Sequence, residues 1–168
     1  MDYGTLLAKL MRMSDEKWKR HANPWSVWTR FVILPFLAIT IWSRILIGWW
    51  CLFPVILLLV WTMVNPGYFG VPVSTRSWAS RATLGERVWL NKKSIAIPDH
   101  HSVFVHILNS VVAVGFIPLI YGLVSFEFFA MLLGLGMVIM GKLWFLDRMV
   151  WLYQDMAQSN EEYCSWLY

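Results

Sequence analysis

The chain has 168 residues, of which 58% are hydrophobic, and a formal net charge of +4. So high an apolar fraction excludes an ordinary soluble domain and predicts a single membrane domain over residues 1–168. An excess of Lys and Arg is typical of the cytoplasmic loops of membrane proteins and attracts anionic lipid. We therefore expect membrane lipid, and no nucleic acid, among the partners.

The N-terminal segment, residues 1–22, combines apolar and basic side chains near helical spacing. Leu6, Leu10 and Trp18 recur along it, with Lys9 and other basic residues between them. This pattern predicts an amphipathic helix that lies on the cytoplasmic surface of the membrane.

Four long apolar runs follow, each near the ~20 residues that cross a hydrocarbon core of ~30 Å. They cover residues 25–43, 45–64, 103–124 and 128–153. Short turns join the first run to the second and the third run to the fourth. The sequence therefore predicts an all-α membrane protein with four transmembrane helices in two antiparallel hairpins.

Breaking residues frame the first hairpin. Asn23 is expected to cap the first transmembrane helix, and Pro24 to occupy its first turn, where the missing N–H is not needed. The string Asn-Pro-Gly at 65–67 is expected to end the second helix and to open a long loop over residues 65–102.

The basic residues lie almost entirely on one side of the runs. Of the fourteen Lys and Arg residues, only Arg44 occupies a hairpin turn. The others lie in the N-terminal segment, in the 65–102 loop or at the ends of the runs on the same side. Because short loops rich in Lys and Arg stay in the cytoplasm, we predict that both termini and the 65–102 loop are cytoplasmic.

The 65–102 loop contains a predicted interfacial helix, capped by Ser74 or Thr75. Its aromatic and small residues share one face at spacings i, i+4, i+7 and i+11, namely Trp78, Ala82, Gly85 and Trp89. A helix of this kind is expected to lie against the membrane or the bundle.

Small and polar residues predict how the transmembrane helices pack. Ala130, Gly134 and Gly141 share a face of the fourth helix and are expected to let a neighbouring helix approach closely. A structural hydrogen-bond network between helices is predicted from the polar residues Asn23, Asn65, Asp99, His106 and Asn109.

Most other ionisable side chains map to the cytoplasmic interface. An active site there would use His21, Glu86, His100, His101, Asp147 and Arg148. A lipid-headgroup site would use Arg30, Arg81, Lys142 and Arg148. Because charges inside a span turn toward partners, we favour an ion-pair lattice, in which Asp147 pairs with Arg30, Arg81 or Lys142, and Arg148 pairs with Glu86 or Asp99.

The His and carboxylate residues carry the atoms that bind zinc or non-haem iron, but their spacing matches no metal-binding motif. Adjacent His100 and His101 are not expected to share a helix face, and at a helix start they are expected to point to solvent. The sequence therefore assigns no metal and no cofactor.

Several strings together resemble a bacterial family of small, four-helix membrane proteins that carry a domain of unknown function. They are His-Ala-Asn-Pro-Trp-Ser-Val-Trp-Thr-Arg at 21–30, Asn-Pro-Gly-Tyr-Phe at 65–69, Gly-Glu-Arg-Val-Trp-Leu-Asn at 85–91 and Lys-Leu-Trp-Phe-Leu-Asp-Arg-Met-Val-Trp-Leu-Tyr at 142–153. The resemblance covers nearly the whole chain. It implies the fold and a location in the bacterial inner membrane, and it implies no reaction.

Three functional hypotheses remain open from the sequence. The first is a non-catalytic accessory or scaffold subunit, which binds a membrane-protein partner or further copies of itself. The second is a small membrane-embedded enzyme, metal-dependent or not, with its site at the cytoplasmic interface. The third is a module that binds a lipid or quinone headgroup. The non-catalytic hypothesis is favoured, because positive-inside topology alone gathers charges at this face.

Overall fold

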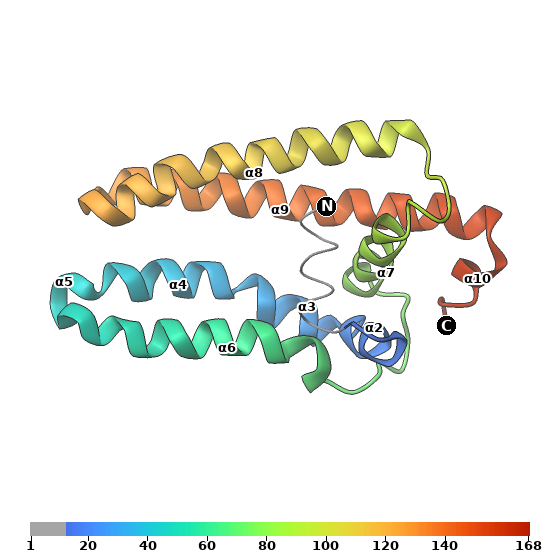
Figure 1. Cartoon of the computed structure of the whole chain (residues 1–168), viewed down its shortest axis with the longest axis horizontal. Coiled ribbons are helices and arrows are strands. Elements are labelled where there is room, and N and C mark those ends of the chain that lie inside the picture. Colours follow the sequence, from blue (N-terminus) through green and yellow to red (C-terminus); the bar gives the residue numbers. More distant parts are fainter. Residues whose placement is uncertain (1–12) are drawn as a thin grey trace.

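The computed structural model describes residues 13–168, which are predominantly helical and contain no strand. In Figure 1 two long helical hairpins lie side by side, and α2, α7 and α10 gather at one common end. The helices in chain order are α2 (Asp15–His21), α3 (Pro24–Phe31), α4 (Ile33–Trp42), α5 (Arg44–Ile47), the 3-10 helix η1 (Gly48–Cys51), α6 (Leu52–Tyr68), α7 (Trp78–Leu90), α8 (Asp99–Ser125), α9 (Phe128–Ser159) and α10 (Glu161–Cys164).

The predicted N-terminal helix is only partly described. Residues 1–12 lie outside the described part of the chain, and α2 covers the remainder. Ser14 caps α2 by accepting a hydrogen bond from the Lys17 backbone N–H.

The first predicted transmembrane helix, 25–43, is divided into α3 and α4 at Val32. Pro35 has no N–H to donate to the Phe31 carbonyl, so the helical ladder is interrupted at this point. Asn23 caps α3 as predicted, since its Oδ1 accepts a hydrogen bond of 3.0 Å from the Trp25 N–H.

The predicted bounds of the second helix, 45–64, are wrong at both ends. The chain reverses through α5 and η1 around Gly48, whose φ of 57° is left-handed, so α6 begins only at Leu52. At its other end α6 continues through the Asn-Pro-Gly string at 65–67 to Tyr68. Asn65 is fully buried and hydrogen-bonded to α3, which holds this last turn in place.

The second hairpin, α8 and α9, is tightly packed through glycines. A β-carbon on Gly134 would lie 2.2 Å from the Leu119 backbone nitrogen, and one on Gly122 would lie 2.2 Å from the Met131 nitrogen. The close approach predicted at Gly134 is therefore confirmed. At 32 residues α9 is about 48 Å long, which exceeds a hydrocarbon core of ~30 Å, and its C-terminal part runs past α7 to α10 (Figure 1).

The predicted helix in the 65–102 loop is confirmed as α7. Its cap is Ser77, whose Oγ accepts a hydrogen bond of 3.0 Å from the Ser80 N–H, so the predicted caps at Ser74 or Thr75 are wrong. Of the predicted face, Ala82, Gly85 and Trp89 are buried and Trp78 is half-buried. This face packs mainly against α9.

The C-terminal segment after α10 binds back to the loop before α7. Thr75 donates its backbone N–H to the Tyr168 carbonyl at 2.9 Å and its hydroxyl to the Trp166 carbonyl at 2.8 Å. This docking uses Thr75, which explains why it does not cap α7. No sequence signal indicated the contact.

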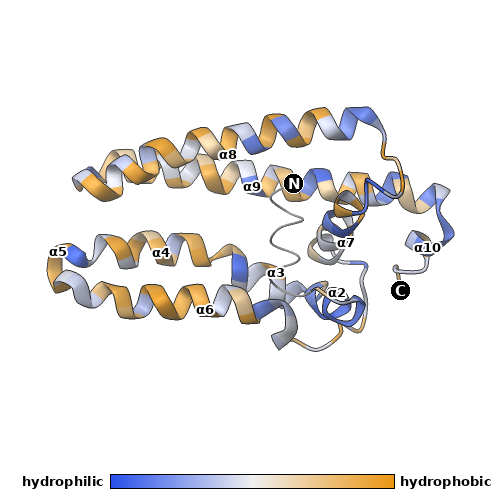
Figure 2. Ribbon diagram, viewed as in Figure 1, coloured by the Kyte–Doolittle hydropathy of each residue, from blue (hydrophilic) through white to orange (hydrophobic). Residues whose placement is uncertain are grey.

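Three helical stretches are long and apolar enough to cross a membrane, namely Pro24–Tyr68, Asp99–Ser125 and Phe128–Ser159. The protein is thus all-helical, with the composition of a membrane protein. The first stretch contains the reversal around Gly48, which is why four predicted runs correspond to three stretches. In Figure 2 hydrophobic residues cover α4, α6 and most of the second hairpin, whereas hydrophilic residues gather around α2, α7 and α10.

Candidate functional site

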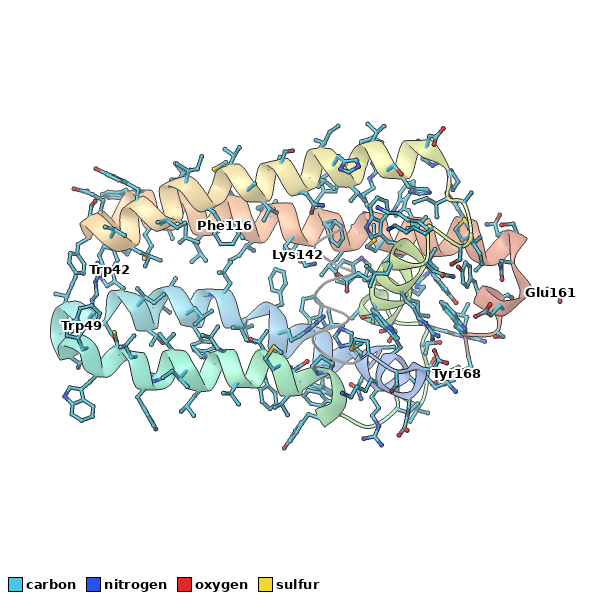
Figure 3. All side chains as sticks on the ribbon, in the orientation of Figure 1. Trp42, Trp49, Phe116, Lys142, Glu161 and Tyr168 are labelled. Carbon is cyan, nitrogen blue, oxygen red and sulfur yellow. The ribbon has the colours of Figure 1, made fainter. Side chains whose placement is uncertain are left out.

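A cluster of charged side chains lies where α7 meets α9, between the apolar and polar parts of the molecule. The Lys142 ammonium donates to a Glu86 carboxylate oxygen at 3.0 Å, and the Glu86 side chain is only 18% exposed. Figure 3 places Lys142 well away from Trp42 and Trp49 at one end and from Glu161 and Tyr168 at the other.

His21 on α2 begins a chain of buried hydrogen bonds beside this cluster. Its Nδ1 lies 2.9 Å from the Ser26 hydroxyl, which donates to the Asn65 Oδ1 at 2.8 Å. The Asn65 amide donates in turn to the Thr29 hydroxyl at 2.8 Å. Because the Ser26 proton is used on Asn65, the His21 Nδ1 carries a proton and donates to Ser26. The chain ties α2, α3 and α6 together.

The surroundings of His21 hold it in the neutral form. Burial lowers its pKa to about 3, aided by the positive charges of Arg30 and Lys142 and opposed by Glu86. The imidazole is only 3% exposed. At neutral pH His21 is therefore an uncharged donor to Ser26, with its Nε2 unprotonated.

Glu86 remains ionised for the opposite reason. Burial acts to raise its pKa, but the positive charges of Lys142 and then Arg30 lower it more, and the net pKa lies below its usual value. The cluster of Arg30, Glu86, Lys142 and neutral His21 thus holds two positive charges and one negative charge. Its surplus positive charge suits an anion.

None of the predicted ion pairs of Asp147 and Arg148 occurs among the described residues. The 65–102 loop and the fourth helix are instead joined by the pair of Glu86 and Lys142, which was not predicted. The specific partners are wrong, because Asp147 accepts a hydrogen bond of 3.0 Å from the Trp78 indole. The Arg148 guanidinium stacks on the Phe104 ring at 4.1 Å.

Four arginines have a buried Nε atom without a hydrogen-bond partner among residues 13–168. Three of them, Arg30, Arg81 and Arg148, are predicted headgroup ligands, and the fourth is Arg44 in the turn of the first hairpin. A buried guanidinium N–H without an acceptor is unfavourable, so these sites have donors to spare for an anionic group.

The start of α8 brings His100 and His101 together with Asp155 of α9. The His101 Nε2 lies 2.8 Å from the Asp155 Oδ2, and the His100 Nε2 lies 3.9 Å from the same atom. The two imidazole centroids are 4.2 Å apart. The prediction that both histidines point to solvent is wrong for His101, which is 2% exposed, and holds for His100, which is 60% exposed. The prediction that they point to different sides is wrong, because both Nε2 atoms approach Asp155.

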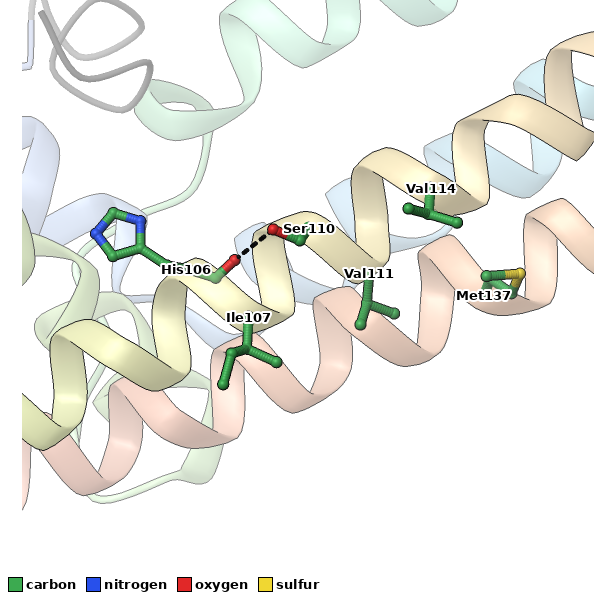
Figure 4. A pocket seen from close by; sticks show the side chains of 6 residues that line it. All are labelled: His106, Ile107, Ser110, Val111, Val114 and Met137. Atoms are coloured by element: carbon green, nitrogen blue, oxygen red, sulfur yellow. Dashed lines mark hydrogen bonds between the residues drawn. The ribbon is translucent and has the colours of Figure 1, made fainter.

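Two other predicted network residues, His106 and Asn109, lie on the exposed side of α8. Within the described residues their side chains make no hydrogen bond to another helix. Asp99 is exposed at the first position of α8. His106 lies at one end of an open groove that continues along α8 past Ser110 and Val111 to Met137 of α9 (Figure 4). The Ser110 hydroxyl donates within the helix to the His106 carbonyl at 2.9 Å.

Sequence reasoning missed Ser26, Thr29 and Asp155. Ser26 and Thr29 sit one turn apart on the face of α3 that meets Asn65, a spacing visible in the sequence once Asn65 is assigned to a helix. Asp155 lies two residues beyond the predicted end of the fourth helix at residue 153, and no spacing in the sequence indicates that it meets His101.

Comparison with known proteins gives a family and nothing more specific. No curated protein and no solved structure matches the chain. The profile of a family of unknown function, DUF6653, matches residues 4–165, and the chain therefore belongs to that family.

Proposed function

We propose that the protein is a non-catalytic scaffold or accessory subunit of the bacterial inner membrane, which crosses the membrane four times with both termini in the cytoplasm. The reversal around Gly48 divides the stretch Pro24–Tyr68 into two arms, each suited to one crossing. The split of basic residues favours the orientation. Trp42 and Trp49 lie together at the opposite end from α7 (Figure 3), where an outer interfacial belt is expected.

The observation that carries the scaffold proposal is the engagement of the candidate catalytic side chains in contacts between segments. His21 joins α2 to α3, Glu86 joins α7 to α9 through Lys142, and Asp147 joins α9 to Trp78. These contacts fasten the polar end of the molecule as one unit on the membrane surface. Side chains used in this way stabilise a platform and are poorly placed to turn over a substrate.

The first hairpin is the proposed contact surface for a membrane partner or a second copy. In the most apolar 18-residue segment of Pro24–Tyr68 only 6% of the residues are buried within the chain, compared with 28% in that of Phe128–Ser159. Large apolar side chains such as Phe53 and Leu57 project from α6. Packing of these side chains against a helix of another protein would give closer van der Waals contacts than fluid lipid tails provide.

Photo-crosslinking in the native membrane tests this proposal. A photoreactive amino acid is placed at Leu57 on α6 and, as a control, at Leu133 on α9, which are 53% and 61% exposed. We expect a protein adduct of defined mass from Leu57 and lipid adducts from Leu133. Two results together would contradict the proposal. Both positions would give lipid adducts alone, and nanodiscs made from the native membrane would contain one copy of the chain and no second protein.

A second function, binding of an anionic lipid headgroup, is favoured by Arg30, Arg81 and Arg148, whose buried Nε atoms have no hydrogen-bond partner among residues 13–168. Arg30 lies beside the Glu86–Lys142 pair, whose cluster carries a surplus positive charge. A phosphate oxygen at this depth would accept the hydrogen bonds that the protein leaves unmade. A quinone carbonyl would be a weaker acceptor for the same donors.

Retention of lipid in native mass spectrometry separates these ligands. Protein in nanodiscs of phosphatidylglycerol should keep bound lipid, whereas protein in phosphatidylcholine, whose headgroup has no net charge, should not. Arg30→Gln should reduce retention, and Arg76→Gln, which alters an exposed arginine, should not. Equal retention of both lipids, or an unchanged Arg30→Gln variant, would rule out the headgroup site.

A further inference from the structure

The cluster of His100, His101 and Asp155 has the composition of a metal site. All three side chains offer a ligand atom, and these atoms lie within 4.8 Å of one another. Two come from the first turn of α8 and one from the C-terminal part of α9, at the polar end of the molecule. We propose that this cluster binds one divalent transition-metal ion, of the class of Zn²⁺, Co²⁺ and Fe²⁺.

The hydrogen bond of His101 accounts for one of the two distances to Asp155, and both distances lie near the separation of ligand atoms around an ion. The His101–Asp155 distance of 2.8 Å is that of a hydrogen bond, but the His100–Asp155 distance of 3.9 Å is too long for one. Ligand atoms around a tetrahedral ion with bonds of about 2.0–2.1 Å lie about 3.3 Å apart. The two observed distances lie on either side of this separation. A small movement of the half-exposed Asp155 side chain would therefore make both equal.

The donor set selects the class of metal. Two imidazole nitrogens and one carboxylate oxygen suit Zn²⁺, Co²⁺ and Fe²⁺, whereas Mg²⁺ and Ca²⁺ prefer oxygen ligands throughout. Three protein ligands leave at least one coordination position for water or another small ligand. The His100 side chain is 60% exposed and that of Asp155 is 49% exposed, so this position faces solvent.

The state of His101 limits the expected affinity. In the structure its Nε2 is paired with Asp155, and its buried Nδ1 has no hydrogen-bond partner among the described residues. Metal binding through Nε2 moves the ring proton to Nδ1, where it finds no acceptor, and ligating histidines usually donate that proton to a neighbour. We therefore expect weaker binding than at a structural zinc site.

The experiment uses the full chain in detergent, without a histidine tag and after treatment with a chelator. Zn²⁺ is titrated by calorimetry, and Co²⁺ is followed by its visible absorption, which reports the ligand geometry. We expect one ion per chain. His100→Ala and Asp155→Asn should each weaken binding by at least about tenfold, a loss seen even when only supporting residues of metal sites are changed. His106→Ala, which removes an exposed histidine of the same helix, should leave binding unchanged.

Two outcomes would overturn the proposal. The first is the absence of a stoichiometric binding step for either ion in the wild-type chain. The second is binding that persists equally in His100→Ala and Asp155→Asn, which would mean adventitious surface binding only. Melting curves without metal check that each variant is folded. His100→Ala is decisive if Asp155→Asn fails to fold, because the His100 side chain is mostly exposed and makes no hydrogen bond within the described chain.

Discussion

Gly85 of α7 lies directly against the backbone of Met149 of α9. A β-carbon on Gly85 would fall 1.9 Å from the Met149 carbonyl oxygen and 2.9 Å from its Cα. Such a contact is impossible without moving one helix away from the other. The platform of α7 on α9, which carries Glu86 and Trp78 to their partners, therefore depends on the absence of a side chain at this position.

Gly85→Ala should destabilise the protein by about 1–3 kcal/mol or more, the usual effect of overpacking. Thermal melting in detergent measures the loss. Gly136→Ala on α9 is the matched control, because its added methyl meets no atom within 4 Å and alanine favours helices by about 1 kcal/mol over glycine. Equal melting temperatures for the two variants would show that α7 does not pack on α9 as described.

The Glu86–Lys142 pair should give a measurable coupling energy. Lys142 is 46% exposed, so water screens the pair, and we expect a coupling of about 0.5–1 kcal/mol. Glu86→Gln and Lys142→Gln, alone and together, form the double-mutant cycle. The control cycle combines Glu86→Gln with Lys93→Gln, which changes an exposed lysine just after α7. The stability losses of these two variants should be additive. Additivity in both cycles would mean that the pair contributes nothing.

The buried neutral His21 should make the protein sensitive to mild acid. Its pKa is lowered to about 3, so between this value and about 6.5 the unfolded chain binds a proton that the folded chain does not. The contribution of neutral His21 to the free energy of unfolding is fully present above pH 6.5. It declines by about 1.4 kcal/mol for each pH unit below that value. The lowered pKa of Glu86 adds a further decline only below about pH 4.5.

Melting temperatures between pH 7.5 and 5 test this effect. His21→Gln should be less stable than the wild type at pH 7.5 but should lose less stability on acidification. His106→Gln changes an exposed histidine and should keep the wild-type slope. An unchanged pH slope in His21→Gln would show that His21 is not held neutral by its surroundings.

Arg44 should fasten the two hairpins at the end opposite α7. Its guanidinium donates to the Leu123 and Val124 carbonyls at 2.7 and 3.0 Å, which the end of α8 leaves without intrahelical partners. It also stacks over the Phe126 ring at 4.4 Å. Arg44→Gln should lower stability by about 1.5–3 kcal/mol, the usual range for a lost hydrogen bond to a charged group. A melting temperature equal to that of the wild type would contradict this role.

The sequence predicted what depends on local pattern. Apolar runs located the helices, and Asn23 with Pro24 located the start of α3, because both signals act within a few residues. The close approach at Gly134 follows from its spacing with Ala130. The reversal was placed too early because the residues of α5 after Arg44, and those of η1, are as apolar as the helices they join, and only the left-handed Gly48 marks the centre of the turn.

Contacts between distant segments were less predictable. That Glu86 pairs with Lys142 rather than with Arg148 depends on how α7 is rotated over α9, and this rotation is set by the Gly85–Met149 contact. Asp155 meets His101 because α9 continues past residue 153 to Ser159 and because α8 begins beside this last part of α9. Neither the Glu86–Lys142 contact nor the His101–Asp155 contact leaves a periodic signal in the sequence, because each arises from the packing of one helix on another.

The most direct test of the four-crossing topology is labelling of single cysteines with a membrane-impermeant maleimide. The native Cys164 is exposed, and in a Cys51→Ala background it reports the polar end. Ser125→Cys in a chain that also carries Cys51→Ala and Cys164→Ser reports the turn between α8 and α9. In spheroplasts we predict that the Ser125→Cys chain is labelled at once, whereas Cys164 is labelled only after the membrane is opened. Labelling of Cys164 in intact spheroplasts, with the Ser125→Cys chain protected, would contradict the account.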